Sequence, residues 1–448
     1  MKKLRFLLLA LCALPFFGKA QTRYVDNIFT NVQVDTGIVY GSNVPYGSNV
    51  AIDLKCDIYQ PVGDSVTNRP VIILLHAGSF LPPAMIPTPG LGTRKDSAMV
   101  HLCKAFAKKG YVTISADYRI GWNPLASTEE ERAKSIMSAV FRAQQDLKAL
   151  IRYLNKEKNT WKIDPTRIAA GGSNSGGYIA IHAGCLNKPA ELSYPKFLDG
   201  NNQPLIDTVA LGNFEGNSGN PGYPSNHRVT ISLGGAVGDT AFMEPGEPVI
   251  LAMHGTADNT PYTTGVVIVN VTGQPVIEVH GGHDMIRRSL NIGNQASLLP
   301  DFANDNPFPG LYPFYGVGFE PYGIYQNSSP GRIDTASKYL DTVITFLTPR
   351  LFKTMDLASW TSKEQADLLK AFSNIYPNPA KNEVFITVDN TLPRIQSISL
   401  MDVTGRTVLT EEYNSYQARL EVGHLPKGIY FVTIKNKDTQ VTKKLVIE

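Results

Sequence analysis

The stretch Arg167–His182, RIAAGGSNSGGYIAIH, holds the residues whose types and spacing are best suited to chemistry. A short apolar run ends there at paired glycines, and helix-like sequence resumes after a turn of small residues. A strand, a sharp glycine-rich turn and a helix are typical of a nucleophile elbow, where a strained serine exposes its oxygen. The spacing G-x-S-x-G fits Gly172 and Gly176, which puts Asn174 at the nucleophile position. A shift by one residue puts Ser175 there instead, so two registers stay open.

The segments around this stretch alternate between strand-like and helix-like patterns. Val71–Leu75 is a continuous apolar run, as expected of a strand buried on both faces. A helix is predicted over about Lys134–Leu154, where apolar residues recur on one face. This alternation predicts an α/β fold with a doubly wound, mostly parallel sheet. A Gly-, Pro- and Asn-rich stretch follows the elbow, and residues of about 186–247 are expected to form a cap-like insertion.

The last part of the chain has a different character. Residues 376–448 contain no long helical pattern but several short alternating segments, such as Val384–Val388. They predict a small all-β sandwich. A chain of 448 residues is expected to form two or three domains. We therefore expect an α/β domain over residues 21–353, a linker over 354–375 and the β domain over 376–448.

The first 20 residues read MKKLRFLLLALCALPFFGKA. Basic residues precede an apolar core, and small residues precede Ala20, which predicts a secretory signal peptide rather than a membrane span. No later run approaches ~18 unbroken apolar residues, so no transmembrane anchor is expected.

The composition argues against several classes of function. A formal charge of +3 gives no basis for nucleic-acid binding. Three cysteines follow the signal segment, Cys56, Cys103 and Cys185, and without a C-x-x-C pair they do not predict a zinc site. At most one disulfide can form among them, and its pairing stays open. No metal and no cofactor is expected.

Four motifs occur in a characteristic order: His76–Phe80, Asp117–Arg119, the elbow and His254–Asp258. On these motifs residues 24–350 resemble a secreted α/β-hydrolase of the esterase/lipase type, as found in Bacteroidetes. Residues 376–448 resemble a C-terminal sorting domain of the type IX secretion system, on the motifs Tyr376–Pro379, Gly405–Arg406, Gly428–Tyr430 and Lys443–Val446. This second resemblance implies the secretion machinery as a partner, release or display at the outer cell surface, and removal of the sorting domain.

The first resemblance implies acyl transfer, in which a serine attacks an ester, a histidine takes the proton and an acid orients the imidazole. Backbone N–H groups stabilise the oxyanion. The resemblance assigns these donors to Ala77, Gly78 and Ser79, and to Ser175 as the residue after the nucleophile position. Because the donors are main-chain groups, an alanine at position 77 removes none of them. Asp258 occupies the position of the acid.

The base is missing from the place where the resemblance puts it, in a G-x-G-H motif after the last strand. The corresponding text is Gly316–Phe319, so Phe319 stands where the histidine is expected, and it cannot accept a proton. A rival is His283, in the sequence His280–His283 after an apolar run. A helix follows directly, so His283 can also be a helix N-terminal residue with no catalytic role.

Two triad positions, Asn174 and Phe319, therefore hold unsuitable residues in the most natural register. The favoured interpretation is a secreted esterase- or lipase-family protein with weak or lost hydrolysis of a small or polymeric carboxylic ester. One alternative is a non-catalytic pseudo-hydrolase that binds a ligand at the cell surface or outside the cell. The other is an active serine esterase that uses Ser175, Asp258 and His283.

Overall fold

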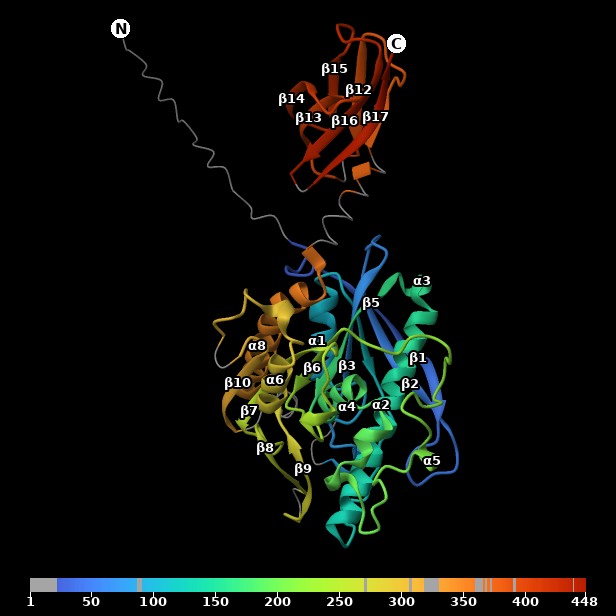
Figure 1. The fold of residues 1–448 in the computed structure, drawn as a ribbon, viewed down its shortest axis with the longest axis vertical. Coiled ribbons are helices and arrows are strands. Elements are labelled where there is room, and N and C mark those ends of the chain that lie inside the picture. The colour runs from blue at the N-terminus through green and yellow to red at the C-terminus, as the bar shows by residue number, and fades with distance from the viewer. Residues whose placement is uncertain are drawn as a thin grey trace, which may run out of the picture. The chain divides into compact units, whose positions relative to one another are not determined.

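The structure is a computed structural model that describes residues 22–86, 91–269, 272–305, 308–317, 330–358, 366, 369–370, 373–389, 392–437 and 439–448. The segment predicted as a signal peptide, residues 1–20, lies outside the described residues. The chain divides into two compact units, Met1–Pro349 and Arg350–Glu448 (Figure 1).

The larger unit is built on an eight-stranded sheet with the order β1-β2-β4-β3-β5-β6-β7-β10. In chain order its strands are β1 Val32–Asn43, β2 Ile52–Pro61, β3 Arg69–Leu75, β4 Val112–Ala116, β5 Ile163–Ser173, β6 Val229–Leu233, β7 Val249–Ala257 and β10 Leu311–Val317. The pairs β1–β2 and β2–β4 are antiparallel, and all other neighbours are parallel. This is the α/β-hydrolase fold, and the predicted doubly wound, mostly parallel sheet is confirmed.

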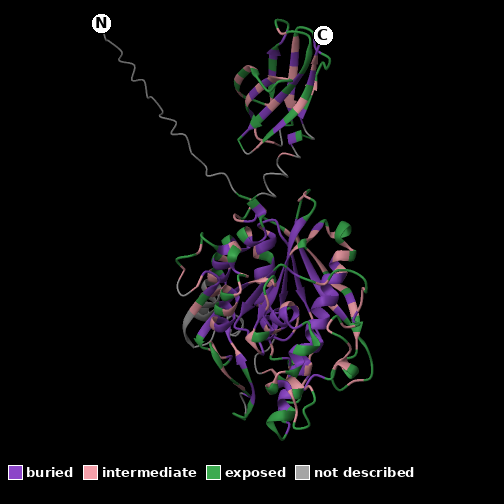
Figure 2. Cartoon of the chain, in the orientation of Figure 1, coloured by how far each residue is buried: buried purple, intermediate pink, exposed green. Residues whose placement is uncertain are grey.

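Helices pack against this sheet, and its strands β3, β4 and β6 are buried along their whole length (Figure 2). The helices of the described residues are α1 Ser97–Ala107, α2 Glu129–Lys156, α3 Lys158–Trp161, α4 Ser175–Cys185, α5 Thr208–Leu211, α6 Gly282–Asn291 and α8 Pro330–Thr354. Helix α2 begins five residues before the predicted start at Lys134. Thr128 and Glu131 form a reciprocal capping box there, which satisfies two otherwise unpaired backbone N–H groups.

The predicted insertion over residues 186–247 needs a correction. Strand β6 lies inside this range, yet it pairs with β5 and β7 in the interior of the main sheet. The stretch before β6 contains only short elements, the 3-10 turns Pro189–Ser193 and Pro195–Phe197 and helix α5. An insertion can therefore extend only to the start of β6, because every residue of that strand is buried.

A two-stranded antiparallel sheet, made of β8 Thr264–Ile268 and β9 Pro275–His280, lies between β7 and α6 in the chain. It is separate from the main sheet. Buried side chains of β9, such as Val276 and Val279, pack into the same apolar cluster as Met285 and Ile286 of α6. Strand β8 contributes as well, since Val267 packs against this cluster and Thr264 Oγ1 donates to Asp284 of α6 at 2.6 Å.

The smaller unit contains two antiparallel sheets, β11-β12-β15 and β14-β13-β16-β17, as predicted for a β-sandwich. Its strands are β11 Ser373–Tyr376, β12 Glu383–Val388, β13 Ile395–Asp402, β14 Thr407–Ser415, β15 Gln417–Glu421, β16 Gly428–Asn436 and β17 Gln440–Ile447. Strand β11 falls partly inside the range 354–375 that was expected to be a linker. Ser373 is buried and pairs with Val388, so the sandwich begins before residue 376.

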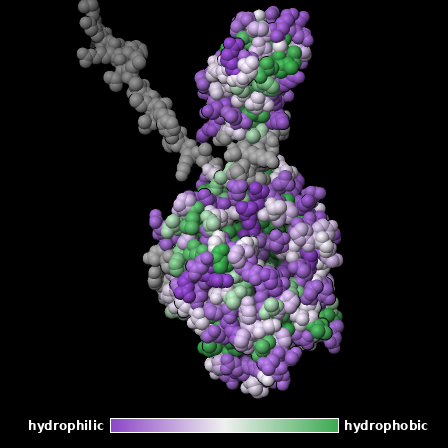
Figure 3. Space-filling view, viewed as in Figure 1, coloured by the Kyte–Doolittle hydropathy of each residue, from purple (hydrophilic) through white to green (hydrophobic). Residues whose placement is uncertain are grey.

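Cys56, Cys103 and Cys185 are all buried and free. Burial raises the pKa of each thiol, so all three stay protonated and inert. None of the helices in the described part of the chain is long and apolar enough to cross a membrane. The face of the larger unit drawn in Figure 3 mixes hydrophilic and hydrophobic residues.

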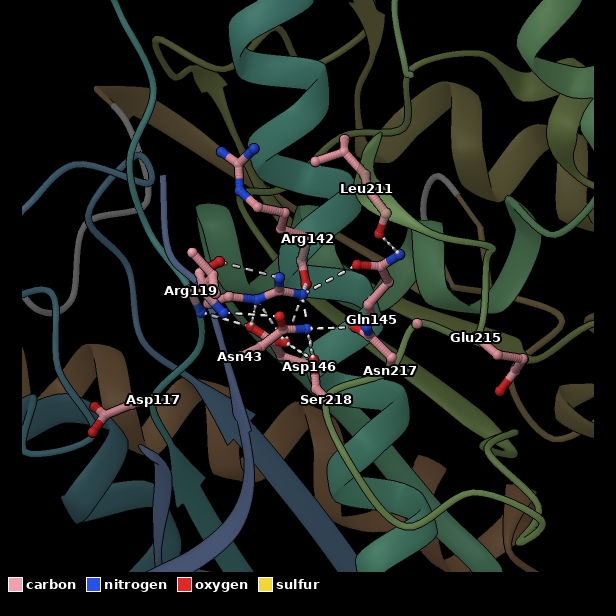
Figure 4. A network of polar contacts seen from close by, with 12 residues as sticks. Asn43, Asp117, Arg119, Arg142, Gln145, Asp146, Leu211, Glu215, Asn217 and Ser218 are labelled. Carbon is pink, nitrogen blue, oxygen red and sulfur yellow. Dashed lines mark hydrogen bonds and ion pairs between the residues drawn. The ribbon is translucent and has the colours of Figure 1, made fainter. Parts of the chain in front are cut away.

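A buried ion pair joins the loop after β4 to helix α2. Arg119 contacts Asp146 at 2.9 Å, and their side chains are only 4% and 0% exposed. The guanidinium also donates to the carbonyl of Arg142 at 3.0 Å and to Gln145 Oε1 at 3.1 Å (Figure 4). The backbone N–H of Arg119 donates to Asp146 as well, at 2.8 Å. Both charges therefore have hydrogen-bond partners, which a buried pair requires to be stable.

The same network fixes the loop that runs before β6. Ser218 Oγ donates to Asp146 at 2.7 Å, and Asn43 at the end of β1 donates to Ser218 at 2.9 Å. Gln145 donates to the carbonyl of Leu211 at 2.9 Å (Figure 4). The loop before β6 thus packs along α2 and β1.

We predict that Asp146→Asn lowers the free energy of unfolding by about 3–5 kcal/mol, because it leaves the Arg119 charge buried without its counterion. Urea unfolding of the full chain measures the change. The matched control is Lys188→Ala, which removes the exposed ion pair with Glu244 and is expected to leave the free energy of unfolding almost unchanged. Equal effects of the two substitutions would contradict this account of the pair.

Candidate active site

The elbow lies between β5, which ends at Ser173, and α4, which begins at Ser175. Asn174 connects them with φ +47° and ψ −110°, a conformation that side-chain-bearing residues rarely adopt. Its backbone N–H donates to the carbonyl of Leu233 on β6 at 2.8 Å. Strained residues of this kind cluster at functional sites, and the strain here is at Asn174.

The two glycines around Asn174 are required by close contact with β3. A Cβ at Gly172 would lie 2.0 Å from the carbonyl oxygen of Leu75, and a Cβ at Gly176 would lie 2.4 Å from the same atom. No side chain fits at such distances. The sharp turn therefore takes its small residues at positions 172 and 176, with Asn174 between them.

Ser175 is completely buried. Its Oγ lies 2.9 Å from the hydroxyl of Tyr118 and 3.4 Å from the carbonyl oxygen of His76. The Tyr118 hydroxyl donates to the same carbonyl at 2.9 Å. The Ser175 hydroxyl thus belongs to a buried hydrogen-bonded triangle.

The loop after β3 has a run of residues with positive φ: Gly78 at +126°, Ser79 at +51° and Phe80 at +58°. Trp122 Nε1 donates to the carbonyl of Ser79 at 2.9 Å, and Gly121 donates to the carbonyl of Phe80 at 2.7 Å. The N–H of Leu81 donates to the carbonyl of Gly78 at 2.9 Å, whereas the N–H groups of Gly78, Ser79 and Phe80 donate to no carbonyl among the described residues. The ring of His76 stacks on Tyr118, with centroids 4.2 Å apart, and supports the base of the loop.

Asn174 connects this loop to the loop that follows β7. Its Oδ1 accepts a long hydrogen bond from Ser79 Oγ at 3.5 Å, and its Nδ2 lies 3.4 Å from Thr260 Oγ1. The backbone N–H of Thr260 donates to Asp258 Oδ1 at 3.0 Å. The structure thus brings Asn174, Ser79 and the Asp258 loop together at the carboxyl ends of the strands, where open α/β sheets place their sites.

Tyr178, one turn into α4, also faces the Asp258 loop. Burial raises the pKa of its hydroxyl, and the negative charge of Asp258 raises it further, while a hydrogen bond with Thr260 lowers it. The phenol is therefore neutral and can donate a hydrogen bond, but it cannot serve as a base near neutral pH.

His254 begins the motif that ends at Asp258, and its role is structural. Its Nδ1 accepts from the backbone N–H of Gly282 at 3.0 Å, so Nε2 carries the proton and donates to the carbonyl of Thr260 at 3.0 Å. Burial lowers the pKa of His254 to about 4, which keeps the ring neutral. This histidine holds the loop between Asp258 and α6.

His283 lies at the start of α6 and pairs with a different acid. Its Nδ1 is 2.9 Å from Asp284 Oδ1, and its ring contacts those of Tyr262 and Phe308 at 5.6 and 5.4 Å. Its backbone N–H donates to the carbonyl of Tyr262. Within the described part of the chain, no polar contact joins His283 to Asp258 or Ser175.

The position expected for the base follows β10. The last residue of that strand, Val317, pairs with Ala257, the residue before Asp258. Phe319 itself lies outside the described residues. Among the described residues, no group of three or more His, Cys, Asp and Glu side chains is arranged to hold a metal ion.

Three residues near the elbow were not singled out by sequence reasoning: Tyr118, Trp122 and Thr260. Tyr118 lies in the motif Asp117–Arg119, which was recognised only as a marker of the fold. Trp122 and Thr260 follow motifs at distances that carry no pattern, so their contacts with Ser79 and Asn174 become visible only in three dimensions.

Comparisons with known proteins agree with this organisation. Residues 56–218 match the BD-FAE family model, and residues 374–448 match the model of the secretion system C-terminal sorting domain. The non-reducing polyketide synthase adrD of Penicillium rubens is 27% identical over 143 residues, which are 31% of this chain. The chain spans 5% of the length of that curated relative.

Solved structures that resemble the chain include those of esterase 2 from Thermogutta terrifontis. Its apo form is 18% identical and covers 70% of this chain and 94% of that chain, with a TM-score of 0.43. The same esterase phosphorylated by paraoxon is 18% identical and covers 73% of this chain and 97% of that chain, with a TM-score of 0.41.

The fold, the elbow and the BD-FAE match define the class of the larger unit as an esterase-like α/β-hydrolase. The particular combination in this chain is a BD-FAE-like hydrolase unit followed by a secretion system C-terminal sorting domain. The sorting domain indicates type IX secretion to the extracellular or cell-surface space and an interaction with the secretion machinery.

We predict that Asn174→Gly raises the free energy of unfolding by about 1 kcal/mol. Glycine tolerates the positive φ, and strain of this type costs of order 1–3 kcal/mol. Only two hydrogen bonds of 3.4 and 3.5 Å are lost. Urea unfolding is the measurement, with Asn202→Gly as the control, since Asn202 also has a positive φ (+58°) but lies in an exposed loop. A loss of stability in Asn174→Gly would show that the amide contacts outweigh the strain.

We predict a loss of stability in acid to which His254 contributes. The folded pKa of about 4 lies below the unfolded value of 6.5, so the unfolded chain binds more protons between these pH values. The stabilisation is fully present above pH 6.5 and falls by roughly 1–3 kcal/mol as the pH drops to 4. In His254→Gln the free energy of unfolding should depend less steeply on pH over this window. Substituting the exposed His424 in the same way should leave the slope unchanged.

Proposed function

We propose that the larger unit is an esterase-family α/β-hydrolase with weak or lost ester turnover, which retains its pocket as a binding site. The proposal rests on the backbone of Asn174, which has the strained conformation that is typical of the nucleophile in an elbow. Asn174 lies between Gly172 and Gly176, where the carbonyl oxygen of Leu75 leaves no room for a Cβ. In this proposal the side chain at the reacting position is therefore an amide.

An asparagine cannot replace a serine in this chemistry. The lone pair of the amide nitrogen is delocalised, and the group has no hydroxyl proton to give to a base. The backbone donors assigned to Gly78, Ser79 and Ser175 do not depend on the side chain at position 174. The site can thus still bind a carbonyl or carboxylate oxygen while it lacks the group that attacks it.

The alternative active set, Ser175 with Asp258 and His283, has less support. The Ser175 hydroxyl is buried and bonded to Tyr118, so attack would require this contact to break. His283 is paired with Asp284. We retain Ser175 and His283 as the residues to test against the proposal, and Phe319 as the proposed degenerate base position.

Labelling with a fluorophosphonate probe, followed by mass spectrometry, tests the proposal. We expect no labelled residue in the wild type and a label at position 174 in Asn174→Ser combined with Phe319→His, where the new serine has a base to activate it. Hydrolysis of an activated ester should be limited to the roughly 10³–10⁴-fold acceleration over water that an oxyanion hole and binding retain without a triad. Asn174→Ser combined with Phe319→His should raise turnover far more than either change alone, because triad members act as a unit.

Two variants separate the alternatives. Ser175→Ala should leave trace activity nearly unchanged, and so should His283→Ala. Robust wild-type activity that disappears in Ser175→Ala, with the label on Ser175, would overturn the proposal and identify the other register as correct.

For export we propose that residues 1–20 are a signal peptide and that the sorting domain is removed after secretion. N-terminal sequencing of extracellular protein should then begin near Gln21, and its mass should lack the C-terminal residues from about 374 onward, the start of the sorting-domain match. Full-length protein retained inside the cell would contradict this maturation.

A further inference from the structure

The side chain of Asn174 uses little of its hydrogen-bonding capacity within the protein. Its two polar contacts in the described part of the chain, with Ser79 Oγ and Thr260 Oγ1, are 3.5 and 3.4 Å long. Both exceed the roughly 2.7–3.2 Å of an ordinary hydrogen bond. A primary amide has two N–H donors and an oxygen with two lone pairs. Because Asn174 is only partly buried, these groups are open to a ligand.

Both neighbours of this amide are hydroxyls, which can donate or accept a hydrogen bond. The amide can therefore flip about its last bond and exchange its oxygen and nitrogen at little cost. Ser79 and Thr260 accept either orientation. Asn174 can thus turn its oxygen or its N–H groups toward a ligand, whichever the ligand requires.

Backbone donors lie beside this amide. The N–H groups of Gly78 and Ser79 donate to no carbonyl among the described residues, and the hydroxyl of Ser79 contacts Asn174. No side chain caps the first turn of α4, so the N–H of Ser175 also lacks an acceptor in the described part of the chain. These groups can only donate, so they select a ligand oxygen, such as that of a carbonyl group.

The charges at the site argue against an anionic ligand. In the part of the chain that the structure describes, no lysine or arginine forms a hydrogen bond or ion pair with Asn174, Ser79 or Thr260. Burial raises the pKa of the nearby Tyr178 hydroxyl, and the negative charge of Asp258 raises it further. The partial positive charge at the N-terminus of α4, about half a unit, is smaller than the full charge of this carboxylate. An anion is therefore disfavoured here, whereas a ligand N–H group is attracted.

We propose that the elbow binds the carboxamide group of a ligand, an inference that rests on the proposed function and narrows it to one class of compound. The ligand oxygen accepts from the backbone N–H groups of Gly78 and Ser79. The ligand N–H donates to Asn174 Oδ1, and Asn174 Nδ2 donates to the ligand oxygen. The two amides then satisfy each other through a pair of hydrogen bonds.

An ester and a carboxylate of the same shape bind less well, for different physical reasons. An ester has no N–H, so it leaves Asn174 Oδ1 without a partner where the ligand excludes water, and binding weakens by about 10-fold or more. A carboxylate has no N–H either, and it also meets the charge of Asp258. The expected order of affinity is therefore amide, then ester, then carboxylate.

Benzamide, methyl benzoate and benzoate test this order, since they share one ring and differ only in the group to be recognised. The half-buried indole of Trp122, which donates to the carbonyl of Ser79, is a suitable neighbour for that ring. Saturation-transfer NMR titrations of the full chain measure the dissociation constants. For so small an amide a value of about 1 mM is expected. Benzamide should bind at least about 10-fold more tightly than methyl benzoate, and benzoate should bind most weakly.

Two variants test the role of the Asn174 side chain. Asn174→Gly removes the amide and is expected to fold, since glycine tolerates the positive φ of this residue. In this variant benzamide should bind no more tightly than methyl benzoate. Asn174→Asp keeps an acceptor oxygen at the same place, so it should keep the preference for the amide and weaken benzoate further.

The matched control is Asn202→Gly, at another positive φ in an exposed loop, which should leave all three affinities unchanged. Thermal unfolding shows whether each variant is folded.

A wild type that does not bind benzamide more tightly than methyl benzoate would overturn the proposal. A preference for the amide that survives Asn174→Gly would overturn it as well, and so would one lost as completely in Asn174→Asp. Fluorophosphonate labelling separates these results from the proposed function. A label on Ser175 together with hydrolysis of methyl benzoate contradicts the proposed function itself, whereas an unlabelled protein without a preference for the amide contradicts only the choice of a carboxamide.

Discussion

The candidate site depends on the close approach of two backbones. The carbonyl oxygen of Leu75, at the end of β3, lies where a Cβ of Gly172 or of Gly176 would be. This contact holds the end of β3 against the elbow, whose apex residue Asn174 has a strained backbone conformation. The oxyanion loop continues directly from Leu75, so a single contact positions the apex of the elbow and the loop that would stabilise an oxyanion beside it.

A second constraint holds the two halves of the candidate oxyanion hole in register. The hydroxyls of Tyr118 and Ser175 and the carbonyl of His76 form a buried triangle, and His76 stacks on Tyr118. His76 leads into the donor loop, and Ser175 is the first residue of α4. The hydroxyl of Ser175 therefore has a structural role in this triangle. The geometry of the hole does not depend on which side chain occupies position 174.

Much of the fold was predictable, because β3 contains the apolar run Val71–Leu75 and β6 is rich in β-branched residues, and both patterns are typical of buried strands. Strand β1 was not predicted. Most of its side chains are partly or fully exposed, and it carries no apolar run that distinguishes it from a loop. The extent of the insertion was overestimated since the strand pattern of β6 was not used as its limit.

The candidate site was predicted only in part, for a different reason. Sequence spacing favoured Asn174 at the nucleophile position but left the register with Ser175 open. The choice depends on distances between β3 and β5, which are far apart in the sequence. The partner of His283 could not be predicted either. Asp258 precedes it and Asp284 follows it, and the sequence does not show which carboxylate lies near its ring. The structure pairs His283 with Asp284 and packs its ring against those of Tyr262 and Phe308.

The strained backbone of Asn174 bears on whether the elbow is still used. A strained apex costs of order 1–3 kcal/mol, a large fraction of the stability of an ordinary domain. A chain with no use for the turn would be stabilised by a glycine at this position or by a relaxed loop. The strained turn occurs together with the loop Gly78–Phe80 and with the hydrogen-bonded triangle of Tyr118, Ser175 and His76. The contact of Asn174 with Thr260 lies in the same small region. The retained strain is therefore more consistent with a site that still has a use than with a hydrolase fold kept only as a scaffold.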